Sequence, residues 1–121
     1  MFRYGLGNFL SRTEMAVKLM VIYPSPKDIE AFETVYNQDH VPMAVGKLAG
    51  KAKIVATRVL GSPAAGEPTF HRVAEVYFPS MEALEHCAAS EGGKQTIAHA
   101  VSISSGGAPL FLVTEEETLV F

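Results

Sequence analysis

The first strong pattern in the chain is the segment 17–23, which is apolar at both odd and even positions. A strand of this kind is covered on both faces, so the segment predicts a central β-strand. Ser25 follows as a candidate N-cap of a helix whose apolar side chains recur at helical spacing. Because Pro42 disfavours helical geometry at the preceding residue, we expect the helix to end near residue 37, with His40 at or just past its end.

Two segments rich in β-branched residues, 52–60 and 70–78, are separated by a loop rich in Gly, Pro and Ser. This pattern predicts an antiparallel hairpin with a long loop. The acidic run 115–117 predicts a solvated turn. The other expected elements are a helix that opens at 79–82, a shorter helix over 94–101, a strand over 110–113 and a possible last strand over 118–121.

The element order β-α-β-β-α-β is that of a ferredoxin-like split βαβ unit, an α+β fold with a four-stranded antiparallel sheet and helices on one face. The first strand is apolar on both sides, so the uncovered sheet face would expose a large apolar patch. Packing against a second copy removes that patch, and we therefore expect a homodimer through the sheet face. The apolar segment 118–121 is expected to pair as a short strand at this interface, with a hairpin inside its own subunit as the alternative.

The chain has 121 residues, enough for one domain, which we place at 15–121 with a peripheral extension over 1–14. A mitochondrial transit peptide is the alternative for the extension. With a net charge of -3 the chain has no basic field for nucleic acid or anionic lipid. It has no run of about 20 apolar residues that could cross a membrane. Its single cysteine, Cys87, fits a reducing compartment, so the cytoplasm is the expected location.

Several short motifs, in order and with consistent spacing, resemble the EthD family, which is named for a protein of ethyl tert-butyl ether degradation. The resemblance implies a dimeric α+β barrel and an oxidoreductase-like activity without a defined reaction. The motifs are Phe32-x-x-x-Tyr36-x-x-x-His40-x-Pro42 with Leu48-Ala49-Gly50, Arg72-Val73-Ala74-Glu75-Val76-Tyr77-Phe78, Ser90-Glu91-Gly92-Gly93 in altered form, and Gly106-Gly107.

His40 is the leading candidate for chemistry, because an imidazole that titrates near neutral pH can donate or accept a proton. Tyr36 lies one helical turn earlier on the same face and could offer its hydroxyl to the same space. Asp39 is adjacent in sequence. The alternative is a histidine that caps the C-terminal end of its own helix.

His99 stands where members of the resembled family commonly have an aspartate, and Ile103 stands where an aromatic residue is usual. If that acid orients the histidine equivalent to His40, two histidines replace an acid-base pair here. We then expect a pH optimum shifted upward or a loss of activity. A partly exposed helix histidine is the alternative for His99, and His71 and His86 are expected at the surface.

Apolar and aromatic side chains near the candidate site could line a cavity for a small, poorly polar organic ligand, although ordinary core packing is the alternative for each. Cys87 falls on the apolar face of its helix and is expected to be an inert thiol. No spacing typical of a metal site occurs, and no cofactor is expected. The candidate substrate-binding residues are Tyr23, Phe32, Asp39, Met43 and Tyr77, with Met20 as a further lining residue.

The sequence therefore supports two functions. The first is cofactor-independent acid-base chemistry on a small hydrophobic molecule, with His40 as the acid-base group, Tyr36 as a hydrogen-bond donor and His99 as the partner of His40. The second is a dimeric protein that binds a hydrophobic metabolite or supports a partner oxygenase without chemistry of its own.

Overall fold

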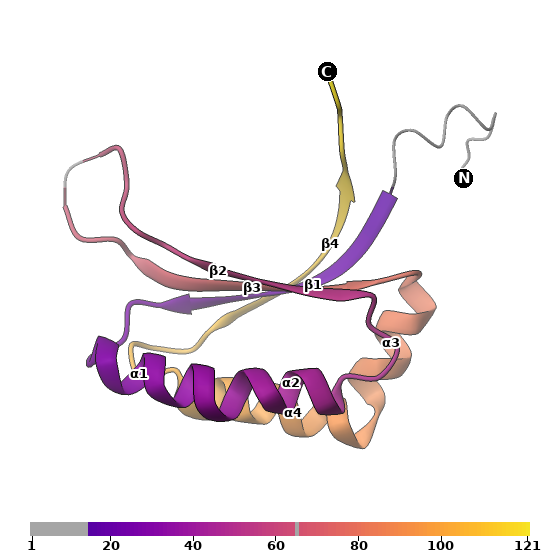
Figure 1. Ribbon diagram of the computed structural model, residues 1–121, viewed down its shortest axis with the longest axis horizontal. Helices are drawn as coiled ribbons and strands as arrows, with labels where there is room; N and C mark the ends of the chain where they lie inside the picture. Colours follow the sequence, from indigo (N-terminus) through magenta and orange to yellow (C-terminus); the bar gives the residue numbers. More distant parts are fainter. Residues whose placement is uncertain (1–14, 65) are drawn as a thin grey trace.

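The computed structural model describes residues 15–64 and 66–121, and the expectations for residues 1–14 lie outside this range. A four-stranded antiparallel sheet, in the order β2-β3-β1-β4, has the helices on one face (Figure 1). The predicted α+β split βαβ fold is confirmed. The strands are β1 Met15–Pro24, β2 Lys53–Arg58, β3 Phe70–Phe78 and β4 Leu110–Glu117; the helices are α1 Ile29–Val35, the π-helical turn η2 Tyr36–His40, α2 Val41–Lys47, α3 Met81–Ala89 and α4 Glu91–Ile103.

The strand β1 is central, as its apolar pattern predicted, with β3 on one side and β4 on the other. Its odd-numbered residues from 17 to 23, such as Val21, face the helices, and its even-numbered residues from 18 to 22, such as Met20, face the opposite side, which we call the outer face. The hairpin of β2 and β3 is also confirmed. Among the described residues, no helix is long and apolar enough to cross a membrane.

The first helical segment differs from the prediction at both ends. Asp28, not Ser25, is the N-cap of α1 and accepts a backbone N–H of the first turn. The helix does not end near residue 37, because η2 and α2 continue it directly to Lys47. In η2 the N–H of Val41 bonds to the carbonyl of Tyr36, five residues back. This wider turn accommodates Pro42, which in a regular helix interior would clash with the preceding turn.

The C-terminal segment also differs. The strand β4 continues to Glu117, so the acidic run 115–117 is not a turn: these residues pair with Met15–Val17 of β1. Residues 118–121 form no strand or hairpin with any other part of 15–64 and 66–121, and Leu119, Val120 and Phe121 are exposed. Figure 1 shows the C-terminus projecting from the sheet on the side away from the helices. The pairing of residues 118–121 with a partner subunit stays a prediction.

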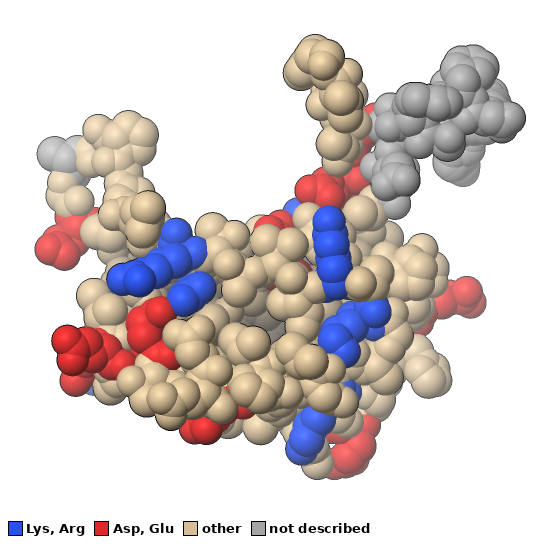
Figure 2. Space-filling model, viewed as in Figure 1, with Lys and Arg blue, Asp and Glu red and all other residues tan. Residues whose placement is uncertain are grey.

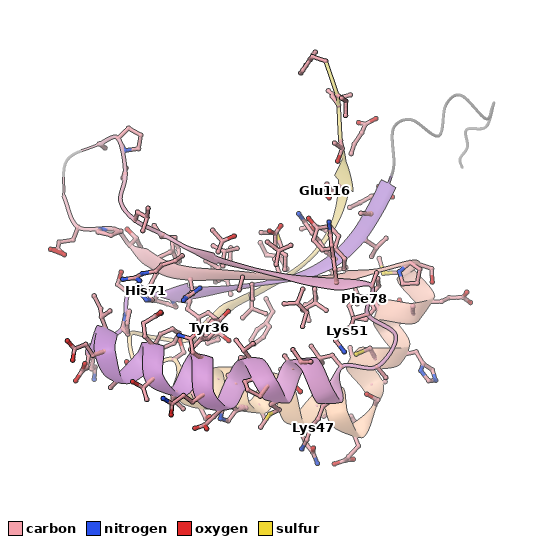
Figure 3. All side chains as sticks on the ribbon, in the orientation of Figure 1. Tyr36, Lys47, Lys51, His71, Phe78 and Glu116 are labelled. Carbon is pink, nitrogen blue, oxygen red and sulfur yellow. The ribbon has the colours of Figure 1, made fainter. Side chains whose placement is uncertain are left out.

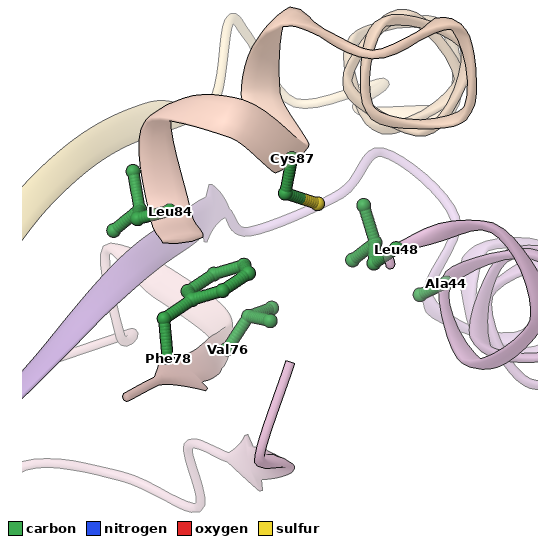
Figure 4. Close-up of a cluster of buried hydrophobic side chains, with 6 residues drawn as sticks. All are labelled: Ala44, Leu48, Val76, Phe78, Leu84 and Cys87. Atoms are coloured by element: carbon green, nitrogen blue, oxygen red, sulfur yellow. The ribbon is translucent and has the colours of Figure 1, made fainter. Parts of the chain in front are cut away.

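The interior contains two hydrophobic clusters instead of one continuous core. The first lies under α3 and includes Phe78 and Cys87 (Figure 4). The second surrounds Tyr23 and Tyr36, at the opposite end of the sheet. Leu19 packs against both. The space between the clusters, on the helix side of the sheet, is where the candidate site lies.

Candidate functional site

A cavity lies between the helix-facing side of the sheet and the helices. Its volume is about 40 Å³. At roughly 10–15 Å³ per water, this is room for about three water molecules. Figure 2 shows a hollow on the face where the sheet edge and α2 meet. The cavity is lined by Leu19, Val21, Tyr36, His40, Val41, Ala44, Leu48, Ile54, Ala74, Val76, Thr96, Ile97, Ala100 and Phe111.

Three of the lining residues carry polar side-chain atoms: Tyr36, His40 and Thr96. The hydroxyl of Thr96 donates to the carbonyl of Gly92 at 2.8 Å, so it is already engaged. Tyr36 and His40 begin and end the π-helical turn η2, and their rings stack with centroids 5.8 Å apart at an angle of 27°. Such turns are often found at functional sites. The turn therefore brings two polar side chains together at an otherwise apolar cavity, and Figure 3 places Tyr36 between the sheet and the helices.

Hydrogen bonds hold both ring nitrogens of His40. Its Nδ1 lies 2.8 Å from Nδ1 of His99 on α4, and its Nε2 lies 3.3 Å from the hydroxyl of Tyr23 on β1. One histidine of the pair must supply the shared hydrogen, so the tautomers of the two rings are coupled. The longer bond to Tyr23 is the weaker one. Both ring nitrogens of His40 are thus engaged by side chains that do not line the cavity.

His40 is neutral at neutral pH, because burial and then the proximity of His99 lower its pKa to about 4. The alternative expectation, a cationic cap at a helix end, is corrected, since the helix continues past His40 and the side chain is 6% exposed. His99 offers no negative charge to stabilise the imidazolium of His40. The expected shift in pH optimum or loss of activity stays a prediction.

His99 is half-buried and stacks against His40, with ring centroids 5.1 Å apart. His99 is thus partly exposed on its helix, as one expectation held. It also contacts His40, as the other expectation held. Ile103, one turn later on α4, packs against the cluster around Tyr23. An aromatic residue is not needed to fill this position.

None of the five expected substrate-binding residues lines this cavity. Tyr23 and Phe32 are buried in the cluster behind it, where they pack edge to face. Asp39 points to solvent, because it lies on the exposed side of η2. Met43 is half-buried and absent from the lining, and Tyr77 lies on the outer face of the sheet. Met20 is on the outer face as well.

The prediction for His71 is wrong, since it is 6% exposed and lies 2.8 Å from a carboxylate oxygen of Glu33. The same carboxylate binds Arg72, and this ionic cluster joins α1 to β3. Sequence reasoning missed it, because the two segments are far apart in the chain and nothing in their spacing signals the contact. His86 is exposed, as predicted.

A second buried charge lies on the outer face. Lys18 is 8% exposed and forms ion pairs with Glu75 and Glu116, and its ammonium also bonds to the hydroxyl of Tyr77 at 3.4 Å. The bond to Glu75 is the main cause of a raised Lys18 pKa. Figure 3 shows Glu116 on the side of the sheet opposite the helices. Beside this cluster, Thr114 has a buried hydroxyl without a partner among the described residues.

No group of three or more His, Cys, Asp or Glu side chains that could hold a metal ion occurs within residues 15–64 and 66–121. Cys87 is buried in the first cluster, and burial raises its thiol pKa, as expected of an inert core thiol. Lys51 donates to the carbonyls of Val45 and Leu48 and so stabilises the end of α2.

The chain resembles known proteins over most of its length, although no family model matches it. An uncharacterized 11.0 kDa protein in the thcB-thcC intergenic region of Rhodococcus erythropolis is 28% identical over 103 residues, which cover 85% of this chain and 97% of that protein. A crystal structure described as an ethyl tert-butyl ether degradation (EthD) family protein from Bacillus halodurans is 31% identical, with a TM-score of 0.76. That match covers 84% of this chain and 98% of the other.

Two further structures share the fold. An EthD-like protein from Ralstonia eutropha is 21% identical with a TM-score of 0.63, over 82% of this chain and 89% of the other. A dimeric ferredoxin-like protein of unknown function from Jannaschia is 13% identical with a TM-score of 0.57, over 83% of this chain and 97% of the other. At these identities the likeness shows the fold alone.

Proposed function

We propose, since this chain belongs to the EthD family, that it binds a small, neutral, largely apolar molecule and transfers a proton at a carbon next to a carbonyl group. Proton transfer of this kind begins isomerisations, aldol-type ring closures and oxidations of activated carbon. His40 acts as the base, Tyr36 as the hydrogen-bond donor and His99 as the partner that sets the tautomer of His40.

One observation carries the proposal. Tyr36 and His40 are adjacent polar side chains at a cavity whose other lining groups are apolar or, for Thr96, already bonded. Ligand sites of this kind combine apolar walls with a few polar groups that fix orientation. A ligand with one acceptor oxygen satisfies Tyr36, while the rest of the molecule contacts the walls. A charged ligand is disfavoured, because the walls offer no compensating charge.

The proposed step uses Nε2 of His40. This nitrogen exchanges its weak bond to Tyr23 for the acidic C–H of the ligand and takes that proton. The electron pair of the broken C–H bond forms a carbon-carbon double bond, and the carbonyl becomes an enolate oxygen. The Tyr36 hydroxyl donates to that oxygen, which stabilises the charge that develops there. Return of the proton to another atom completes an isomerisation.

The low pKa of His40 favours a second candidate function. A base is most effective when its pKa lies near the working pH, and His40, with a pKa of about 4, is a weak base. The same geometry can bind a hydrophobic metabolite without reacting with it, either for storage or for a partner oxygenase. The two functions share a ligand and differ in turnover.

Exchange of the α-hydrogens of cyclohexanone in D2O separates the two candidates. We expect the protein to accelerate the exchange, seen as loss of the proton NMR signal, and we expect His40→Gln and Tyr36→Phe to reduce the rate at least 100-fold. Methylcyclohexane, which has a similar shape and no acceptor, serves as the binding control. Binding of cyclohexanone without faster exchange supports the non-catalytic function. No binding of either compound contradicts both.

A homodimer through the outer face is the second part of the proposal. Leu110 and Leu112 of β4 are exposed on this face beside Met20, and the apolar residues 119–121 project from the same side. Association of two copies removes this surface from water. The paired charges around Lys18 satisfy one another within the subunit, which lowers the cost of burying them. A cytoplasmic location stays part of the proposal.

A further inference from the structure

An ion pair ties the first helix to the sheet directly beside Tyr36. The Arg72 Nε donates to Glu33 Oε2 at 3.0 Å, and its Nη2 donates to Oε1 at 2.7 Å. Two parallel bonds of this type fix the plane of a guanidinium group, which one bond would not do. Glu33 comes from α1 and Arg72 from β3, and both side chains are mostly buried.

Further contacts hold this ion pair in place. His71 bonds to the Glu33 carboxylate at 2.8 Å, and the ring of Phe32 packs edge-on against His71 with centroids 5.5 Å apart. The bonds from Arg72 and then His71 lower the Glu33 pKa to about 2, against the opposing effect of burial. Glu33 therefore stays ionised, and Arg72 stays locked, across the range in which the protein works.

The locked guanidinium lies over the ring of Tyr36. The Cζ atom of Arg72 is 4.8 Å from the ring centroid, and Phe32 stacks on the same ring with centroids 5.5 Å apart and an angle of 18°. A cation at this distance is attracted to the ring face. The Tyr36 ring is thereby held by a cation and an aromatic neighbour, and Tyr36 also lines the cavity.

We propose that Arg72 is a positioning residue for Tyr36, which fixes the orientation of the ring at the cavity and favours negative charge on its oxygen. This inference rests on the proposed function, because it assigns Tyr36 a ligand oxygen to contact. A phenol donates a stronger hydrogen bond when negative charge on its own oxygen is stabilised. Arg72 supplies that effect through the ring, and Glu33 and His71 keep it there.

The charged groups around Tyr36 shift its pKa in opposite directions. Burial raises the pKa of Tyr36, Arg72 lowers it and Glu33 raises it. The other titratable groups that face the ring are Tyr23 and His40, which pack against it with centroids 5.6 and 5.8 Å away. Both are neutral at neutral pH, so Arg72 and Glu33 are the charges that act on Tyr36.

The test measures the ionisation of position 36 directly. Tyr36 is replaced by 3,5-difluorotyrosine, whose phenol ionises well below that of tyrosine, and its titration is followed by fluorine NMR in the full chain. We expect Arg72→Met to raise this pKa by about one pH unit and Arg72→Lys to restore most of the difference. Glu33→Gln should lower it, because the glutamine oxygen can still accept from Arg72 while the negative charge is gone. Shifts of opposite sign in Arg72→Met and Glu33→Gln exclude a general loosening of the fold.

Ligand binding provides the second readout, with unlabelled protein. Arg72→Met is expected to weaken cyclohexanone binding about tenfold and to leave methylcyclohexane binding unchanged. A pKa that stays within 0.2 units in both Arg72→Met and Glu33→Gln overturns the inference; if Arg72→Met does not fold, the result for Glu33→Gln decides. If cyclohexanone fails to bind the unaltered protein, the proposed function fails, while the pKa shifts still judge the role of Arg72.

Discussion

At the scale of the residue, the central feature is a buried histidine without a carboxylate partner. Neither neighbour of the His40 ring nitrogens, Tyr23 or His99, is a carboxylate. Neither compensates a positive charge, so burial keeps the imidazole neutral. His40 is thus suited to accept a proton only briefly or to orient a neutral ligand. We propose that its partner at position 99 controls which of these two roles it has.

Replacement of His99 by aspartate tests that control. A carboxylate at this position stabilises the imidazolium, so we expect His99→Asp to raise the pKa of His40 from about 4 by two units or more. Nitrogen NMR of the imidazole follows the titration. His99→Asn is the control, since it keeps a polar group without the charge. An equal pKa for His40 in the aspartate and asparagine variants would contradict this account.

The low pKa of His40 also predicts how stability depends on pH. The unfolded chain binds a proton at this group below about pH 6.5, and the folded chain does so only below about 4, so stability falls as the pH drops between these values. The full effect is on the order of 3 kcal/mol. Urea unfolding of His40→Gln should show a flatter dependence from pH 6.5 to 4. An unchanged slope there would show that His40 titrates normally.

Glu33 is a second group whose titration makes stability depend on pH, in a lower pH range than that of His40. Its folded pKa of about 2 lies below its ordinary value of 4.5, so its stabilising effect is complete above 4.5 and is lost as the pH falls toward 2. The Glu33→Gln variant should therefore be less stable than the unaltered chain at pH 7 and should approach it in stability at pH 2. Urea unfolding at the two pH values checks this, and a constant difference between the chains would contradict it.

Among the secondary-structure elements, the π-helical turn η2 determines which polar side chains reach the candidate site. It keeps α1 and α2 in one continuous helix and sets Tyr36 and His40 on the cavity side. The sequence did not reveal this turn, because Pro42 is compatible either with a helix end or with the first turn of a renewed helix. The choice depends on packing of the two helical segments against the sheet, which local spacing does not contain.

The start of α4 shows a second effect of packing on an element. Ser90 caps α4, and Gly93 lies so close to α3 that an added Cβ would stand 1.9 Å from the carbonyl oxygen of Cys87. We expect Gly93→Ala to destabilise the chain by roughly 1–3 kcal/mol, because one of the helices must move. Thermal unfolding measures the loss. A melting temperature equal to that of the unaltered chain would contradict the close approach.

Gly46 in α2 offers the matched control for this substitution. An added Cβ there meets no atom within 4 Å, so Gly46→Ala should stabilise the helix by roughly 0.5–1 kcal/mol. The two variants make the same chemical change in helices of the same layer. Opposite signs separate the effect of packing from that of helix propensity.

At the scale of the whole molecule, the fold was predictable and the site only partly so. The apolar pattern on both sides of β1 placed it at the centre of the sheet, and the turn residues 61–68 defined the hairpin. Tyr36 and His40 were found by their helical spacing. The surroundings of these two residues were not predicted, because Arg72, Glu33 and the cavity walls come from segments that are far apart in the sequence and come together only in the folded chain. The end of β4 was misread because three glutamates resemble a turn.

The proposed dimer gives a prediction at this scale. Deletion of residues 118–121 removes three exposed apolar side chains from the outer side of the sheet. Full burial of each would contribute on the order of 1.5–3 kcal/mol, so the deletion should weaken the dimer at least tenfold. Sedimentation velocity over a dilution series measures this, with Leu60→Ser, an exposed loop change, as the control. An unchanged dissociation constant contradicts a role for these residues in the interface.

If Tyr36 and His40 form the polar end of an apolar ligand site, a crystal of the protein soaked with cyclohexanone will show the ligand there. We expect its ring between the sheet and α2, with its oxygen within about 3 Å of the Tyr36 hydroxyl. The walls would move slightly to enlarge the cavity of about 40 Å³. A ligand that binds with its oxygen turned away from Tyr36 and His40, or that leaves this cavity empty, would contradict the claim.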